Sequence, residues 1–145
     1  MSNILIIEAC FYQDVATLLR EGAIDVLNKQ GHEYEIETVP GALEIPATLN
    51  FFISGKKKYD AYVVLGCVIR GETSHYDIVC NESARGVYDL VLKHNLALGN
   101  GILTVENKDQ AIARADPQKK NKGGDAAKAA LRMLELRRKI LIDTV

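Results

Sequence analysis

Residues 61–69 read AYVVLGCVI, a continuous apolar run without a charged side chain. A run of this kind is typical of a strand covered on both faces, as in a parallel sheet. The polar sequence RGETSH follows at residues 70–75, and a long helix is expected from about Ser74 to Asn95. The sequence therefore predicts a fully buried strand that leads into a long helix through a short polar loop.

Three other segments predict strands. Ile4–Ile7 is a shorter apolar run, and a further strand is expected from about Leu96 to Val105. Residues 33–39 alternate instead, with glutamates at every second position and less polar side chains between them. A period of two places these sets on opposite faces, which predicts a half-exposed strand at a sheet edge.

Helices are predicted between and after these strands. The first starts at Asp14, which can cap it, and stops at Gly31. Others are expected over residues 45–54, 109–115 and 125–140. Strand and helix alternate four times, and crossovers between parallel strands are right-handed. We therefore predict an α/β three-layer sandwich with a four-stranded parallel sheet in flavodoxin-like order, formed by the whole chain as a single domain.

Composition excludes several classes of protein. The 145 residues are 48% hydrophobic and 26% charged, which is typical of a globular domain and not of a disordered chain. The net charge of −1 argues against broad binding to nucleic acid or anionic membranes, and no apolar run approaches the roughly 20 residues of a transmembrane helix. The three widely spaced cysteines form neither a disulfide framework nor a zinc pattern, so we expect a reduced, cytoplasmic, metal-free protein.

The carboxyl ends of parallel strands share one edge of the sheet, where ligands bind. Phe11 follows the first predicted strand and Glu44 follows the second. Phe11 could stack on a planar ligand, although packing against the next helix is the interpretation that this segment alone favours. Glu44 could accept hydrogen bonds from ligand hydroxyls, or it could cap the helix that it precedes.

The loop after the buried strand predicts an anion site. Gly71 permits close backbone approach, and the amides of Glu72 and Thr73 are expected to point out of the start of a helix, where phosphate binds readily. The Thr73 hydroxyl could add a donor or cap the helix. His75 lies beside this loop and could transfer a proton near neutral pH.

Other charged residues carry less information. His32 and His94 stand next to helix ends and are interpreted as capping or surface residues. Arg114, near the end of a short helix, fits either an interaction with that helix end or a guanidinium fork on phosphate. Lys122 alone indicates nothing.

Four blocks of the sequence resemble the lumazine synthase family, the 6,7-dimethyl-8-ribityllumazine synthases. The third block is long and specific, and together the blocks run over nearly the whole chain. They are Phe11 with its flanks, residues 39–46 (VPGALEIP), residues 65–82 (LGCVIRGETSHYDIVCNE), and residues 101–107 (GILTVEN) with Gln110-Ala111, Arg114-Ala115 and residues 121–123 (NKG).

The resemblance implies a defined reaction that uses no metal and no redox cofactor. In this family, 5-amino-6-(D-ribitylamino)uracil condenses with 3,4-dihydroxy-2-butanone 4-phosphate. The primary amine attacks the ketone to give a Schiff base, phosphate is eliminated, and ring closure with loss of water gives 6,7-dimethyl-8-ribityllumazine. The reaction belongs to riboflavin biosynthesis.

The resemblance also implies a role for each matching residue. Phe11 would stack on the pyrimidine ring, and His75 would be the proton shuttle. The remaining contacts would be Ala42, Leu43 and Glu44 to the ribityl chain, Cys67, Val68 and Ile69 to the ring through backbone groups, Glu72, Thr73 and Arg114 to the phosphate, and Asn100 and Lys122 in the same pocket.

Family members form homopentamers, and some assemble further into decamers or sixty-subunit shells. In the family, the positions of Asn100, Arg114 and Lys122 come from the neighbouring subunit, so the active site is shared. The first strand begins near residue 3, without the extension that some shell-forming members have, so a pentamer or decamer is expected. Cys67 stands where some members have threonine, and Asn100 where an aromatic is frequent, which could weaken contacts to the ring.

Three alternative functions share parts of this pattern. A non-catalytic flavin- or lumazine-binding protein, or a shell protein of the same fold, would not need His75, Thr73 and Arg114 together. A phosphoacceptor receiver domain needs an aspartate at the end of the third strand, where this chain has Gly66-Cys67-Val68. An archaeal-type riboflavin synthase, which joins two lumazines, would not need the phosphate site.

Overall fold

A parallel sheet forms the centre of the molecule. The computed structural model describes residues 1–141. The strands lie in the order β2-β1-β3-β4, which is flavodoxin-like, and all pairs are parallel. Their bounds are Asn3–Ala9 for β1, Glu33–Val39 for β2, Ala61–Ile69 for β3 and Leu98–Val105 for β4. The predicted fold class is confirmed.

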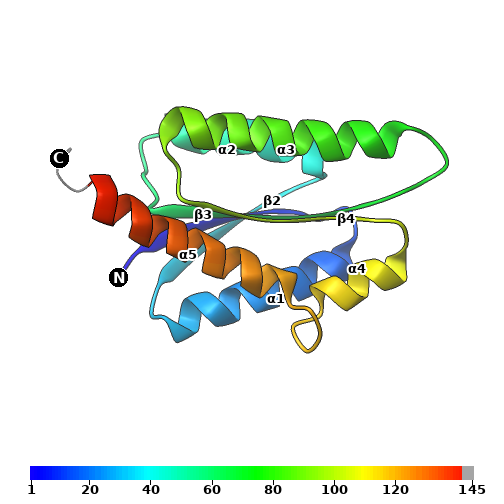
Figure 1. Ribbon diagram of the computed structural model, residues 1–145, viewed down its shortest axis with the longest axis horizontal. Coiled ribbons are helices and arrows are strands. Elements are labelled where there is room, and N and C mark those ends of the chain that lie inside the picture. The colour runs from blue at the N-terminus through cyan, green and yellow to red at the C-terminus, as the bar shows by residue number, and fades with distance from the viewer. Residues whose placement is uncertain (142–145) are drawn as a thin grey trace.

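Helices cover both faces of the sheet (Figure 1). One face carries α2 (Ile45–Ser54) and α3 (His75–His94), and a short 3₁₀ turn, η1 (Ala42–Glu44), leads into α2. The other face carries α1 (Gln13–Lys29), α4 (Lys108–Ala115) and α5 (Lys122–Leu141). Two apolar cores fill the layers between helices and sheet, which makes the predicted three-layer sandwich.

The position of each strand in the sheet follows from its sequence. β3 lies between β1 and β4, and Ala61 to Val68 are all buried, as the continuous apolar run predicted. β2 is an edge strand in which only Val39 is buried, which confirms the prediction from its alternating glutamates. None of the helices within residues 1–141 is both long and apolar enough to cross a membrane.

Two helix starts differ from the sequence prediction. Asp14 was expected to cap α1, but the helix begins at Gln13 and the Asp14 carboxylate accepts a bond from the neighbouring Val15 amide at 2.9 Å. α5 begins at Lys122, three residues before the predicted start. Asn121, directly before α5, has a positive φ of 49°. Its side chain accepts a hydrogen bond from the Gly124 amide at 3.3 Å and so caps the helix. Gly31, with a φ of 75°, ends α1 as predicted.

Several large apolar side chains of α2 and α3 are exposed in the single chain. Only Ile45 and Leu49 of α2 are buried, whereas Phe51 is 70% exposed. On α3, Leu92 is 79% exposed and Tyr88 is 44% exposed. The helix α2 therefore carries apolar side chains beyond the face that its own sheet buries.

Candidate functional site

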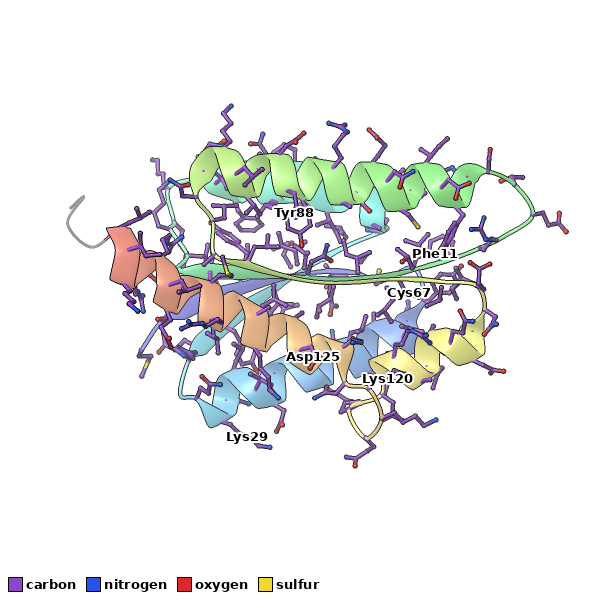
Figure 2. All side chains as sticks on the ribbon, viewed as in Figure 1. Phe11, Lys29, Cys67, Tyr88, Lys120 and Asp125 are labelled. Atoms are coloured by element: carbon purple, nitrogen blue, oxygen red, sulfur yellow. The ribbon has the colours of Figure 1, made fainter. Side chains whose placement is uncertain are left out.

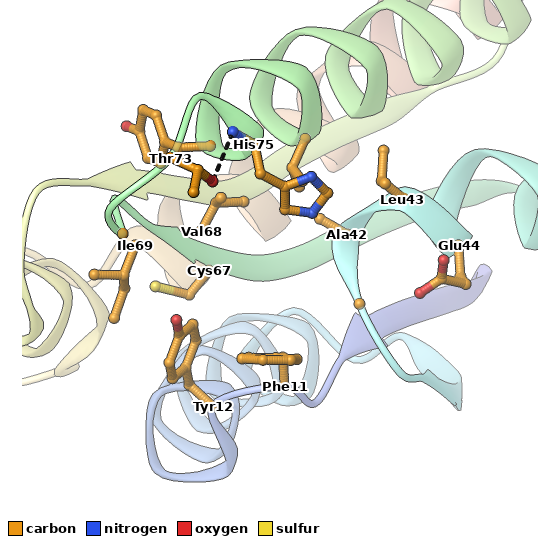
Figure 3. Close-up of a pocket in the computed structure, with 14 residues that line it drawn as sticks. Phe11, Tyr12, Ala42, Leu43, Glu44, Cys67, Val68, Ile69, Thr73 and His75 are labelled. Atoms are coloured by element: carbon orange, nitrogen blue, oxygen red, sulfur yellow. Dashed lines mark hydrogen bonds between the residues drawn. The ribbon is translucent and has the colours of Figure 1, made fainter.

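A cavity of about 370 Å³ opens at the carboxyl ends of β1 and β3. Its walls come from the loop after β1, from η1, from the end of β3 and from the start of α3 (Figure 3). The residues that line it are Phe11, Tyr12, Gly41, Ala42, Leu43, Glu44, Cys67, Val68, Ile69, Gly71, Thr73, His75, Tyr76 and Val79.

Phe11 presents its ring to this cavity. The side chain is 71% exposed, so the interpretation that it packs against the next helix is wrong. Its ring makes a T-shaped contact with the half-buried Tyr12 ring, with centroids 4.9 Å apart and planes at 72°. The exposed Phe11 ring is therefore available to stack on a planar ligand.

The turn after β2 brings a carboxylate to the cavity. Glu44 ends η1 and directly precedes α2, but its side chain makes no capping hydrogen bond there. Glu44 thus occupies the N-cap position, as the capping interpretation expected, but its exposed carboxylate forms no bond to the helix and can accept bonds from a ligand. Ala42 is buried in the turn, and Leu43 is 39% exposed beside Glu44.

The end of β3 offers backbone groups to the cavity. β3 pairs with β4 as far as Ile69, but its pairing with β1 ends at Leu65. Residues 66–69 therefore have no strand partner on the β1 side, where the cavity opens. Burial raises the pKa of the Cys67 thiol to about 12, so this side chain stays protonated and is not a nucleophile.

His75 is the first residue of α3, and its ring lies across the cavity from Phe11 (Figure 3). Its backbone amide donates to Thr73 Oγ1 at 3.3 Å, so the threonine occupies the helix entrance. Glu72 and Thr73 lie in the exposed loop directly before α3, next to the helix start where their amides were expected. Glu72 does not line the cavity wall, whereas Thr73 does.

Tyr76 and Val79 line the cavity but were not predicted. Val79 stands four residues after His75, so both lie on the same side of α3. Helical spacing counted from His75 was the signal that could have found Val79. Tyr76 had no such signal, because its position depends on the arginine that it stacks against.

Asn100, Arg114 and Lys122 lie together, but not with His75. They line a second cavity of about 430 Å³ between the outer edge of β4 and the helices α4 and α5. Asn100 Oδ1 accepts from the Ile102 amide at 2.8 Å. Arg114 Nη1 donates at 3.1 Å to the Gln110 carbonyl, one turn earlier in α4 and not at its carboxyl end, and Lys122 Nζ lies 3.6 Å from Asp125 Oδ2.

Different parts of one chain thus hold the two groups of predicted residues. Figure 2 shows Phe11 and Cys67 at the carboxyl ends of the strands, and Asp125, a neighbour of Lys122, beside the start of α5.

The other two histidines, His32 and His94, are outside both cavities. His94 is exposed, but His32 is half-buried and accepts from the Ser2 amide at 3.2 Å, so it is neither a cap nor a surface residue. Within residues 1–141, no group of three His, Cys, Asp or Glu side chains is placed to hold a metal ion.

The model of one protein family, 6,7-dimethyl-8-ribityllumazine synthase, matches residues 1–138. The chain belongs to the lumazine synthase family. A Zymomonas mobilis protein named 6,7-dimethyl-8-ribityllumazine synthase is 56% identical over 140 residues, which cover 97% of this chain and 99% of that protein. A Sphingopyxis alaskensis protein of the same name is 54% identical over 137 residues, covering 94% of this chain and 96% of its own length.

A Rhizobium meliloti protein named 6,7-dimethyl-8-ribityllumazine synthase 1 is 54% identical over 142 residues, which cover 95% of this chain and 93% of that protein. Similarity of this extent runs through both cavities and confirms the predicted lumazine synthase family. The receiver-domain alternative is excluded with it.

Proposed function

We propose that the protein catalyses the condensation of 5-amino-6-(D-ribitylamino)uracil with 3,4-dihydroxy-2-butanone 4-phosphate, as a lumazine synthase of riboflavin biosynthesis. The products are 6,7-dimethyl-8-ribityllumazine, phosphate and water. One observation carries the proposal: a single cavity gathers an exposed aromatic ring, a carboxylate, the loop residues Gly71 and Thr73, and a histidine. The chain that forms this cavity is 56% identical over 140 residues to a protein named 6,7-dimethyl-8-ribityllumazine synthase.

The aminouracil occupies the inner half of the cavity in this proposal. Phe11 stacks on the pyrimidine ring, and the unpaired edge of residues 66–69 hydrogen bonds to the ring's amide groups. The ribityl chain runs toward Ala42 and Leu43, where Glu44 accepts from its hydroxyls. Stacking and a row of backbone bonds together fix the orientation of the amine that reacts.

The butanone phosphate occupies the outer half. Its phosphate binds the amides of Glu72 and Thr73 and the Thr73 hydroxyl, at the amino-terminal end of the 20-residue helix α3. The ketone then lies between this loop and the aminouracil. His75 lies two residues after Thr73 and lines the same cavity. Its imidazole therefore lies next to both the aminouracil and the butanone phosphate in this proposal.

Proton transfer and positioning account for the catalysis in this proposal. The amine attacks the ketone carbonyl, and water leaves as the Schiff base forms. His75 moves protons between nitrogen, oxygen and carbon in these steps and in the elimination of phosphate. Ring closure with loss of water completes the lumazine. Holding both reactants in one cavity lowers the entropic barrier, and the loop stabilises the charge of the departing phosphate.

We further propose that Asn100, Arg114 and Lys122 complete the site from a neighbouring copy of the chain. Their position in a separate cavity supports this, since a ligand bound at His75 does not meet them within one chain. The exposed apolar side chains of α2 and α3, such as Phe51 and Leu92, support self-association. A homopentamer or decamer is the expected assembly. Three free thiols support a cytoplasmic location, and the chain acts as a single domain.

The activity is tested by incubating the purified protein with both substrates and following lumazine fluorescence. The proposal expects lumazine and one phosphate per turnover, and no product when either substrate is omitted. A protein that binds lumazine tightly but forms none would instead support the non-catalytic alternative. Formation of riboflavin from two lumazines would support the archaeal-type alternative.

A further inference from the structure

The loop between β3 and α3 has few attachments. Residues 71–74 are all exposed, and a Cβ at Gly71 would have no heavy atom within 4 Å. Within the described residues, the only bonds of Thr73 and Ser74 are local ones, to the amides of His75 and Asp77 at the start of α3. The loop that binds phosphate in the proposed function is therefore held mainly at its two ends.

Arg70 forms the attachment at the β3 end. Its backbone amide donates to the Val105 carbonyl at 3.0 Å, which continues the pairing of β3 with β4. Its side-chain Nε donates to Glu106 Oε1 at 2.8 Å, and Nη1 lies 3.7 Å from Asp77 Oδ1. Arg70 does not line the cavity, so its charge is directed away from the bound reactants.

The same guanidinium stacks on a residue that does line the cavity. The Arg70 guanidinium carbon lies 4.2 Å from the centroid of the Tyr76 ring. Arginine can stack flat on a ring while the N–H groups at its edge donate hydrogen bonds, because its charged group is planar; a lysine ammonium has neither this flat face nor this fork of donors. Arg70 thus joins both ends of the loop, since it precedes residue 71 and holds Tyr76 and Asp77 in the first turn of α3.

Glu106, the partner of Arg70, is itself fixed. Its backbone amide donates to Gln110 Oε1 at 2.8 Å. The carbonyl of Gln110 in turn accepts from Arg114 Nη1 at 3.1 Å. The arginine of the loop is thus connected through two residues to an arginine of the second cavity.

We propose that Arg70 is a positioning residue that holds the phosphate-binding loop closed between Tyr76 and Glu106. This role rests on the proposed function, because the loop matters only where a phosphate-bearing substrate binds. Arg70 contacts no reacting atom. Its effect is to keep the amides of Glu72 and Thr73 turned toward the cavity, so that binding of the phosphate does not have to order the loop.

The test compares Arg70→Ala and Arg70→Lys with the matched control Arg132→Ala. Arg132 also pairs with a carboxylate, that of Glu135, but both lie on α5 outside the two cavities. We expect Arg70→Ala to raise the KM for the butanone phosphate by about ten- to a hundredfold, with little change in the KM for the aminouracil. Arg70→Lys recovers only a minor part of the loss, and the control leaves both constants unchanged. Equal changes in the two KM values, or full recovery by lysine, would overturn the proposal.

Glu106→Gln separates positioning from direct phosphate binding by Arg70. A positioning role predicts weaker phosphate binding in Glu106→Gln, and no further loss when Arg70→Ala is added, because both changes open the same contact. A direct role predicts unchanged or tighter binding in Glu106→Gln, since the guanidinium is released toward the anion.

Calorimetric titration with inorganic phosphate gives the same comparison without turnover. If the wild-type protein makes no lumazine but Arg70→Ala still weakens phosphate binding, the proposed function fails and the positioning role stands. If lumazine forms and Arg70→Ala binds phosphate as the wild type does, the positioning role alone fails.

Discussion

Thr73 Oγ1 accepts a hydrogen bond from the backbone amide of His75 at 3.3 Å. This bond fixes the hydroxyl of the loop between β3 and α3 relative to the backbone of His75. The contact caps the entrance of α3 and holds His75 at the cavity rim (Figure 3). In the proposed reaction, the group that binds the phosphate, on Thr73, and the group that takes the proton, on His75, therefore lie two residues apart in the chain.

His75→Ala removes the proposed proton shuttle while leaving the cavity walls in place. We expect turnover to fall by roughly ten- to a thousandfold, because one general acid–base group contributes about that much, while both substrates still bind. Steady-state kinetics and equilibrium binding of the aminouracil give the two values. Turnover equal to that of the wild type would contradict the role of His75.

Arg114→Ala removes a cation from the second cavity. In the proposed function this arginine contacts the phosphate from a neighbouring copy, so the KM for the butanone phosphate should rise by at least about tenfold. The KM for the aminouracil should change little. A rise confined to the aminouracil would show that Arg114 does not serve the phosphate.

Glu8 predicts a stability effect away from both cavities. Its carboxylate is 3% exposed and accepts from Arg20 Nη1 and Thr38 Oγ1, each at 2.9 Å, which ties β1 to α1 and β2. Because Glu8→Ala leaves Arg20 and Thr38 unpaired, the free energy of unfolding should fall by about 2–4 kcal/mol. Urea unfolding measures it.

The matched control is Asp25→Ala, which breaks the exposed pair with Lys29 on α1. That change should cost under about 1 kcal/mol. A Glu8→Ala loss no larger than the control's would show that the buried carboxylate does not stabilise the fold.

His32 predicts a dependence of stability on pH. Burial lowers the pKa of His32 below its usual 6.5, aided by the nearby N-terminal amine and Arg138, whereas Asp60 opposes the shift. The unfolded chain therefore takes up this proton first as the pH falls. The contribution of His32 to stability is complete above 6.5 and decreases as the pH falls from there toward the lowered pKa.

Thermal unfolding between about pH 5 and pH 8 checks this, with His32→Gln as the comparison. The wild type should lose more stability than the variant on the acid side. Parallel curves for the two proteins would contradict the proposed titration.

The fold could be predicted because its signals are local and periodic. The apolar run from residue 61 to 69 favours burial on both faces, and the alternation from residue 33 to 39 favours an exposed face. The first pattern therefore predicts an inner strand of the sheet and the second an edge strand. The boundaries were less certain. The helix α5 starts three residues before the expected position, where the Asn121 side chain accepts from the Gly124 amide.

The site was only partly predictable for a physical reason. Residues such as Phe11 and His75 follow strand ends, so the parallel topology alone brings them together. Phe11 contacts the Tyr12 ring, and Tyr76 stacks against Arg70; such side-chain contacts produce no periodic pattern in a sequence. The division into two cavities followed from the resemblance to the lumazine synthase family and not from spacing.

The central claim is that His75 and Arg114 act in one site formed by two copies of the chain. It is tested most directly by co-expressing His75→Ala and Arg114→Ala chains and assaying the mixed assembly for lumazine. Random mixing in a ring gives an intact pair at about a quarter of the interfaces, so activity should return to about a quarter of the wild-type rate. A mixture no more active than the average of the two separate variants would place both residues in the same chain's site and contradict the claim.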